Sequence, residues 1–167
     1  ILSYALEFRG HGKSSGPKGN VEDIDNLLND IKRLLEYIYC LHPNKPIFLL
    51  AESMGAALAV KTSMLIDKIE GIILLAPMFN ISKKTRPTKF TMNFLLGLSK
   101  IFPQLKLINK NKRTPYNYEK YNEKFYLSEY TNKDNINLGT FRQCYNICIW
   151  INENKKLFIG IMLFHFL

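Results

Sequence analysis

The chain has 167 residues, 47% of them hydrophobic and 13% aromatic, which suits one globular domain with a buried core and excludes an intrinsically disordered protein. Its formal net charge of +9 belongs to the second half, because residues 1–81 carry 8 basic and 9 acidic side chains whereas residues 82–167 carry 15 and 5. The three cysteines are an odd number without framework spacing, which excludes a disulfide-stapled secreted scaffold and indicates a reducing compartment.

The first part of the chain predicts a strand, a glycine-rich turn and a long helix. Residues 1–8 are apolar and β-prone, so they predict a buried strand that ends at Arg9-Gly10-His11-Gly12. Asn20 is a good N-cap for the helix that follows. The apolar residues of this helix recur at the spacing of one helical face: Ile24, Leu27, Leu28, Ile31, Leu34, Leu35 and Ile38.

Two further apolar runs predict parallel strands separated by a helix. Pro43 and Pro46 end the first helix, and residues 47–50 form a short apolar run typical of strands that are covered on both faces. Residues 56–60 favour helix, and residues 71–76 form a second apolar run. Strands and helices that alternate in this way predict the α/β class, with a doubly wound parallel sheet.

The composition changes after Asn80. Residues 82–137 are rich in Lys, Asn and Tyr, which indicates an insertion at the edge of the sheet. One helix is expected within it, with an apolar face of Phe90, Phe94, Leu95, Leu98, Ile101 and Phe102. Another is expected over residues 138–150, with Leu138, Phe141, Tyr145, Cys148 and Ile149 on one side. Residues 157–167 predict a further buried strand and are too few to span a bilayer.

Ser53 is the main candidate for chemistry because it stands between a predicted strand and a predicted helix. A nucleophile elbow is a sharp turn that exposes a serine hydroxyl at the end of a strand, and it requires small residues two positions before and after the serine. Ala51 and Gly55 occupy these positions here. The Ala51 methyl group is expected to crowd a turn in which glycine is usual.

Three motifs carry a resemblance to a known family. Phe8-Arg9-Gly10-His11-Gly12-Lys13-Ser14-Ser15-Gly16 resembles the GHGxSxG loop of α/β-hydrolases. Residues 51–57 resemble the GESMGGA elbow of the monoacylglycerol lipase and lysophospholipase family, and residues 75–78 match its LAPM stretch. The resemblance implies a partial α/β-hydrolase fold, truncated at both ends: a core over residues 1–81, a helical cap over 82–152, and the start of a further core strand over 153–167.

The resemblance also implies roles for single residues. Ser53 matches the nucleophile, and the backbone N–H of Met54 matches one oxyanion donor. Ala51 and Gly55 complete the elbow, and the loop motif comprises Gly10, His11, Gly12 and Gly16. The second oxyanion donor of the family is expected before Ile1.

The catalytic acid and base of the family follow the cap, and this chain has no match for either. Asp134 falls within the cap, and His165 is followed by only two residues. His11 is expected to support the structure of its loop, and His42 to cap the first helix or face water. A matched catalytic triad is therefore not expected within these residues.

The resemblance implies a serine hydrolase of carboxylic esters, of the lysophospholipase or monoacylglycerol lipase type. Its partner would be a lipid ester substrate, and it would need neither a metal nor an organic cofactor. Cys144 and Cys148 are four residues apart and could face one metal ion, but no further ligand nearby completes a zinc site. The face from Phe90 to Phe102 either lines an acyl pocket or packs the cap on the core.

The alternative is a non-catalytic relative that binds lipid or an anionic membrane surface through residues 83–113. The basic residues of this segment are Lys83, Lys84, Arg86, Lys89, Lys100, Lys106, Lys110, Lys112 and Arg113. An ordinary solvated face would also explain the charge, and no nucleic-acid partner is expected, since no recognition motif accompanies it. A cytoplasmic or membrane-peripheral location is expected, because neither a signal-peptide pattern nor a transmembrane run is visible.

Overall fold

The computed structural model describes residues 1–81, 86–107, 128–130, 136–156 and the backbone of 163–166. The chain divides into two compact units. The loop unit comprises residues 1–22 and 89–142, and the sheet unit comprises residues 23–88 and 143–167. The core, cap and strand ranges expected from the sequence remain a prediction.

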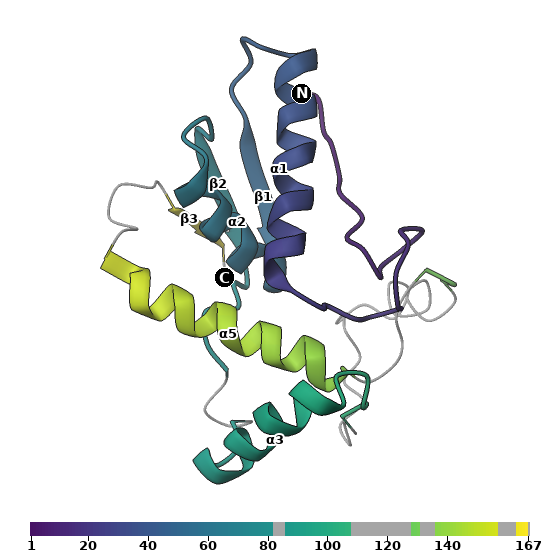
Figure 1. Cartoon of the computed structure of the whole chain (residues 1–167). Coiled ribbons are helices and arrows are strands. Elements are labelled where there is room, and N and C mark those ends of the chain that lie inside the picture. Colours follow the sequence, from purple (N-terminus) through teal and green to yellow (C-terminus); the bar gives the residue numbers. More distant parts are fainter. Residues whose placement is uncertain (82–85, 108–127, 131–135, 157–162, 167) are drawn as a thin grey trace. The chain divides into compact units, whose positions relative to one another are not determined.

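The sheet unit contains a three-stranded parallel sheet in the order β1-β2-β3 (Figure 1). Its strands are β1 (Phe48–Glu52), β2 (Gly71–Leu75) and β3 (Leu163–Phe166). The register pairs Glu52 of β1 with Leu75 of β2, so both strands end at the same edge of the sheet. The predicted α/β class is confirmed in this unit.

Two helices belong to the sheet unit in full: α1 (Ile24–Leu41) and α2 (Met54–Leu65). The helix α2 packs on β1 and β2, and α1 packs on α2. The hydrophobic core between α2 and the sheet consists of Ala56, Ala59, Val60, Ile72 and Leu74, with Leu49, Ala51, Met64, Ile69 and Phe79 packed around them. The buried side of α1, with Ile24, Leu27, Leu28 and Leu35, is the side that the sequence pattern predicts.

The N-cap predicted for α1 is wrong. Asp23 is the N-cap, in extended conformation, and its side chain accepts a hydrogen bond from the backbone N–H of Asp25. Asn20 is buried instead, in the loop unit. Both residue types are good N-caps, and the sequence alone does not show which of the two leaves the helical backbone conformation.

The expectation that β1 is covered on both faces is also wrong. Leu49 and Ala51 pack toward α2, but the alternate side chains Phe48 and Leu50 remain 59% and 69% exposed. Successive side chains of a strand point to opposite faces of the sheet, so one helix layer covers only half of them. Within the described residues, α2 is the helix that packs on this strand.

The loop unit contains the glycine-rich turn, α3 (Lys89–Ile101) and the first residues of α5 (Leu138–Asn154). Residues 1–8 form no strand, and Ile1, Leu2 and Tyr4 are exposed, so the predicted buried strand is wrong. An apolar run becomes a strand only when a neighbouring strand pairs with it. None of the described strands pairs with this segment.

Both helices predicted after residue 82 are present, but the side chains that each of them buries differ from the predicted apolar face. Phe90, Phe94, Ile101 and Phe102 are exposed, and the buried side chains of α3 are Met92 and Ser99. The two uses expected for the face from Phe90 to Phe102, an acyl pocket or packing on the core, remain predictions. The buried side of α5 comprises Leu138, Ile147, Cys148 and Ile151, and Ile149 is exposed instead. Among the described residues, no helix combines the length and the apolar character needed to cross a bilayer.

Candidate active site

The chain makes a strained turn at Ser53, between the end of β1 and the start of α2. Ser53 has φ 52° and ψ −117°, in the region of positive φ that side chains other than glycine rarely adopt. Three backbone hydrogen bonds hold it there. Its N–H donates to the carbonyl of Leu75 (3.0 Å), and its carbonyl accepts from the N–H groups of Met78 (3.1 Å) and Ala57 (3.4 Å). Strain that the surroundings impose in this way is characteristic of functional sites.

A second strained residue lies beside the first. Ala76 has φ 41° and follows the last residue of β2. Because Glu52 pairs with Leu75, Ser53 and Ala76 each leave the sheet at the same level. The sequence pattern does not reveal this feature, since Pro77 marks the end of the strand but does not specify the conformation of the residue before it.

The Ser53 side chain is exposed and makes no capping hydrogen bond to α2. A serine at a helix N-terminus usually caps the first turn, so this hydroxyl remains available for chemistry. The N–H of Met54 begins α2, where the helix has no internal acceptor for its first N–H groups. A negative charge that develops next to Ser53 would therefore meet the positive end of the helix dipole.

The expected crowding of the elbow by Ala51 is not observed. A Cβ atom built at Gly55 would lie 3.9 Å from the Cβ of Ala51, an ordinary van der Waals distance. The Ala51 methyl group therefore does not crowd Gly55, and the strain of the turn is confined to the backbone of Ser53.

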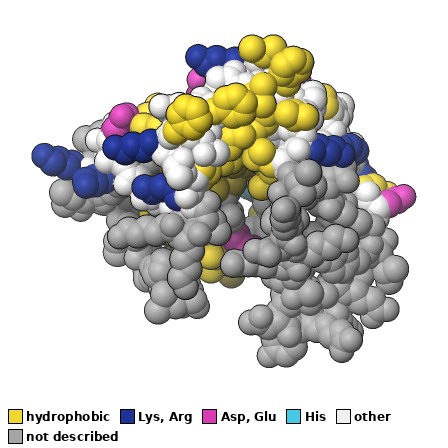
Figure 2. All heavy atoms as spheres, turned by 90° about the horizontal axis from the view of Figure 1, so that it is seen from below, with side chains coloured by type: hydrophobic (Ala, Val, Ile, Leu, Met, Phe, Trp, Pro, Cys, Tyr) yellow, Lys and Arg dark blue, Asp and Glu magenta, His cyan; other side chains and the backbone are white. Residues whose placement is uncertain are grey.

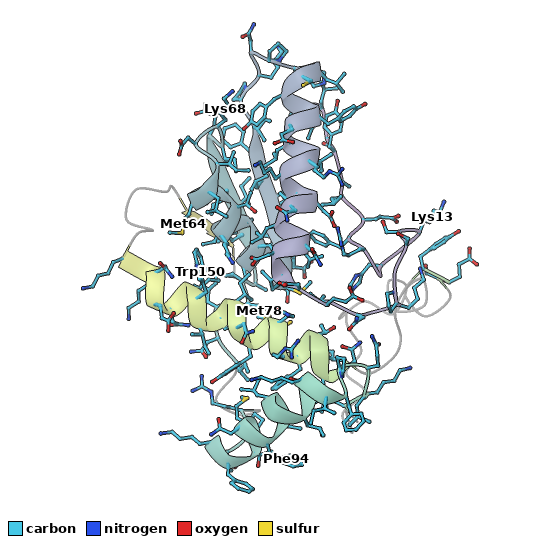
Figure 3. All side chains as sticks on the ribbon, viewed as in Figure 1. Lys13, Met64, Lys68, Met78, Phe94 and Trp150 are labelled. Atoms are coloured by element: carbon cyan, nitrogen blue, oxygen red, sulfur yellow. The ribbon has the colours of Figure 1, made fainter. Side chains whose placement is uncertain are left out.

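Sulfur-containing side chains of α5 pack against the elbow within the sheet unit. The Cys144 thiol lies 3.8 Å from the Met54 sulfur, and the Cys148 thiol donates to the carbonyl of Met78 at 3.5 Å. Figure 3 labels Met78 beside α5. Burial raises the pKa of the Cys144 thiol to about 11, with a smaller contribution from the charge of Cys148. Burial also raises the pKa of the Cys148 thiol. Both thiols are therefore uncharged at neutral pH. The described residues include no group of three or more His, Cys, Asp or Glu side chains that could hold a metal ion.

The glycine motif forms a closed turn in the loop unit. Gly10, Gly12 and Gly16 all have positive φ, and a Cβ atom at Gly10 would lie 2.6 Å from the carbonyl oxygen of Pro17. The His11 ring is used within the turn, because its Nδ1 donates to the carbonyl of Arg9 at 3.1 Å. The hydrogen bond of His11 within the turn is consistent with the expectation that this residue supports the structure of its loop.

The predicted site residues thus fall into two groups. Ala51, Ser53, Met54 and Gly55 come together in the sheet unit, and Gly10, His11, Gly12 and Gly16 come together in the loop unit. His42 is the C-cap of α1. Asp134 and the side chain of His165 lie outside the described residues, although the backbone of His165 pairs with Leu74 in the sheet.

Several known proteins are similar to this chain in sequence. The family model described as "Serine aminopeptidase, S33" matches residues 1–165. The monoglyceride lipase of Homo sapiens is 28% identical over 108 residues, which are 64% of this chain and 35% of that protein. The caffeoylshikimate esterase of Arabidopsis thaliana is 26% identical over an alignment covering 90% of this chain and 47% of that protein.

A solved structure has the same fold. The monoacylglycerol lipase of Paleococcus ferrophilus superposes with a TM-score of 0.76 at 19% identity, over 95% of this chain and 58% of that one. The present chain therefore spans roughly a third to three fifths of the length of the proteins that it matches.

Proposed function

We propose, because the chain belongs to the serine aminopeptidase S33 family, that it acts as a serine hydrolase of lipid carboxylic esters with Ser53 as the nucleophile. The resemblance to the monoacylglycerol lipase family is confirmed, and the chain has a partial α/β-hydrolase fold. The observation that carries the proposal is the geometry of Ser53: its backbone is strained and donates to Leu75 of β2, and its exposed side chain makes no capping hydrogen bond to α2.

In the proposed reaction, the Ser53 hydroxyl attacks the ester carbonyl and forms a tetrahedral intermediate. The Met54 N–H donates to the oxyanion at the N-terminus of α2. A general base accepts the serine proton and then gives it to the leaving alcohol. Water hydrolyses the acyl-enzyme, which releases the fatty acid and restores the serine.

The general base, the acid and the second oxyanion donor are proposed to come from sequence outside these 167 residues. The support for this is that the chain covers only 35% to 58% of the length of the relatives it matches, and that the acid and base of the family, which follow the cap, have no motif match in it. Without a base, a serine hydroxyl is a weak nucleophile. Well-built sites that lack triad members retain only about 10³–10⁴-fold acceleration over water.

The proposed substrate class follows from the relatives. The human relative is named a monoglyceride lipase and the Arabidopsis one a caffeoylshikimate esterase, so a carboxylic ester is the bond that the two names share. The wide apolar surface of this chain and its motif match to the lipase branch favour a lipid ester.

The proposed nucleophile can be tested by covalent labelling. The folded chain is incubated with a fluorophosphonate probe, and the modified residue is located by peptide mass spectrometry. We expect a slowly formed adduct at Ser53, because no base is proposed within these residues, and no adduct in Ser53→Ala. The matched control is Ser63→Ala, which removes a serine of α2 whose hydroxyl donates to the carbonyl of Val60 and should label like the parent. An adduct at another serine, or labelling that survives Ser53→Ala, would contradict the assignment.

A second candidate function is the binding of lipid or of an anionic membrane surface without catalysis, through residues 83–113. Its support is the charge of this segment, which contains nine basic residues and no acidic one. Membrane binding by a chain that is folded but never labels would favour this candidate. Labelling at Ser53 would favour the hydrolase.

A further inference from the structure

Two side chains of α5 bind the backbone of the segment that follows β2. We call this segment, residues 77–80, the post-β2 segment; it begins directly after the strained Ala76. The Cys148 thiol donates to the carbonyl of Met78 at 3.5 Å. The Asn152 amide donates to the carbonyl of Phe79 at 2.9 Å. Two consecutive carbonyl groups of the post-β2 segment therefore accept hydrogen bonds from one helix.

The post-β2 segment also binds the backbone of the serine. The Met78 N–H donates to the Ser53 carbonyl at 3.1 Å, and the Phe79 N–H turns back to the Pro77 carbonyl at 3.0 Å. Phe79 follows Met78 directly in the chain. The carbonyl that Asn152 binds is thus one residue away from the N–H that binds Ser53.

The Asn152 amide bridges its own helix and the post-β2 segment. Besides the Phe79 carbonyl, its nitrogen donates to the carbonyl of Cys148 at 2.8 Å, one turn earlier in α5. An amide group has two N–H bonds to donate, so this pair of contacts uses both and fixes the direction of the side chain. Asn154 makes the same kind of bond to its own helix, at 2.7 Å from the carbonyl of Trp150, but within the described residues it has no hydrogen bond to the post-β2 segment.

The part of α5 that carries Asn152 is fixed within the sheet unit. Its neighbours Cys148 and Ile151 are buried. The Lys61 ammonium group of α2 lies 5.3 Å from the centre of the Trp150 ring, which Figure 3 labels on α5, and 3.1 Å from the Asp25 carboxylate of α1. The Asn152 bond therefore ties the post-β2 segment to a helix that is itself attached to α2.

We propose that Asn152 is a positioning residue for Ser53: its bond to the Phe79 carbonyl holds the post-β2 segment in the place where Met78 keeps the serine in its strained conformation. A strained backbone persists only where its surroundings impose it. Ser53 has φ 52°, and a serine released from this region would turn its hydroxyl back onto the first turn of α2 as an ordinary N-cap. The fraction of molecules with an available hydroxyl, and with it the apparent reactivity, would then fall.

This inference deepens the proposed function and rests on it in one respect. The positioning matters for catalysis only if Ser53 is the nucleophile. The backbone contact between Met78 and Ser53 can be followed without any chemistry at the serine. Two measurements, one of reactivity and one of the contact, therefore separate the two proposals.

The test compares Asn152→Asp with Asn154→Asp in the full chain. Aspartate has nearly the shape of asparagine, but its ionised carboxylate donates no hydrogen bond and would repel the Phe79 carbonyl. Both substitutions remove a bond to a carbonyl of α5, and both place a negative charge at the C-terminal end of this helix. The bond to the post-β2 segment is lost only in Asn152→Asp.

The first readout is the second-order rate constant for fluorophosphonate labelling at Ser53. Hydrophobic side chains gather on the face of the molecule that Figure 2 shows, so a probe with a long alkyl chain would concentrate there whatever the state of the elbow. A small diethyl fluorophosphate avoids this. We expect Asn152→Asp to slow labelling by about fivefold, the factor that corresponds to one hydrogen bond, and Asn154→Asp by less than about twofold. Asn152→Gln keeps both N–H donors and should recover most of the parent rate.

The second readout is hydrogen exchange at the Met78 amide, measured by NMR. We expect this amide to exchange about fivefold faster in Asn152→Asp, relative to the amides of α1, and at the parent rate in Asn154→Asp. A variant that only lowers the stability of the fold would speed the exchange of Met78 and of α1 together. The ratio of the two exchange rates therefore distinguishes positioning from general stabilisation.

In a chain that labels at Ser53, the proposal requires both changes in Asn152→Asp, and either change alone would overturn it. Faster exchange throughout α1 would also overturn it, because Asn152 would then only stabilise the fold. If the parent chain does not label, while Asn152→Asp still speeds exchange at Met78 alone, the proposed hydrolase fails and the holding of Ser53 through Asn152 stands.

Discussion

The strain at Ser53 predicts an inverted effect of glycine on stability. In helix interiors, glycine is less favourable than alanine, since it loses more backbone entropy on folding. At an N-cap, the position of Ser53 in α2, glycine is already tolerated better than alanine, and the positive φ adds to that difference. Ser53 has φ 52°, where alanine keeps the steric penalty and glycine removes it. Ser53→Gly should therefore be more stable than Ser53→Ala.

The size of the effect follows from two opposing contributions. A residue other than glycine in a sparsely populated backbone region costs about 1–3 kcal/mol. The extra entropy that glycine loses on folding costs roughly 0.5–1 kcal/mol. The Ser53 hydroxyl makes no capping hydrogen bond, so both variants lose the same small contribution from it. The net expectation is that Ser53→Gly exceeds Ser53→Ala in stability by about 0.5–2 kcal/mol.

Urea unfolding and thermal melting measure this difference, and each kcal/mol corresponds to about 2–4 °C in Tm for a chain of this size. The control is Ser63, which lies in α2 with its hydroxyl donating to the carbonyl of Val60 at 2.9 Å. There Ser63→Gly should be less stable than Ser63→Ala by about 1 kcal/mol, so the sign reverses. Equal stabilities of Ser53→Gly and Ser53→Ala, or a Ser53→Gly variant that is less stable than Ser53→Ala, would show that the elbow is not strained.

Two other predictions concern the loop unit and the thiols. Gly10→Ala should destabilise the chain by at least about 2 kcal/mol, because φ is 74° and the new Cβ would lie 2.6 Å from a backbone carbonyl oxygen. Gly97→Ala, in the open outer side of α3, should stabilise it by about 1 kcal/mol, and thermal melts that rank the two variants the other way would refute the loop geometry. In the folded chain, maleimide should modify the exposed Cys40 first, and Cys144 should react slowly at pH 8 and faster toward pH 11, since burial raises its pKa to about 11. Mass-spectrometric peptide mapping over time decides this, and Cys144 reacting as fast as Cys40 at pH 8 would contradict the packing of α5 on the elbow.

The features predicted correctly are those that short segments of sequence determine. The face of α1 follows from apolar spacing within one helix, and β1, α2 and β2 follow from two apolar runs with small residues between them. The elbow at Ser53 was predictable for the same reason, since strand, turn and helix are consecutive in the chain. The strand register was not predicted; in the structure Glu52 pairs with Leu75, directly before Ser53 and Ala76.

The features predicted wrongly depend on what lies beside a segment. Residues 1–8 have the composition of a strand, but pairing is a property of two segments, and none of the described strands pairs with them. The apolar run that contains Phe48 and Leu50 predicted a strand covered on both faces, but both side chains are exposed, because coverage depends on a neighbouring layer and not on the strand itself. The apolar positions of α3 were identified correctly, whereas the sequence did not show that Met92 and Ser99 form its buried side.

The position of Ser53 and its reactivity have different origins in the chain. The backbone hydrogen bonds of Ser53 join it to Leu75, to Met78 and to its own helix, so α2, β2 and the post-β2 segment hold the strained turn. The burial of Val60, Ile72 and Leu74 between the helix and the sheet stabilises those three elements together and offsets the strain at the turn. A base that removes the serine proton contributes to none of these contacts. The sheet unit can therefore keep a correctly shaped elbow whether or not a base is present, so slow labelling confined to Ser53 in a folded chain would locate the defect in proton transfer rather than in the geometry of the serine.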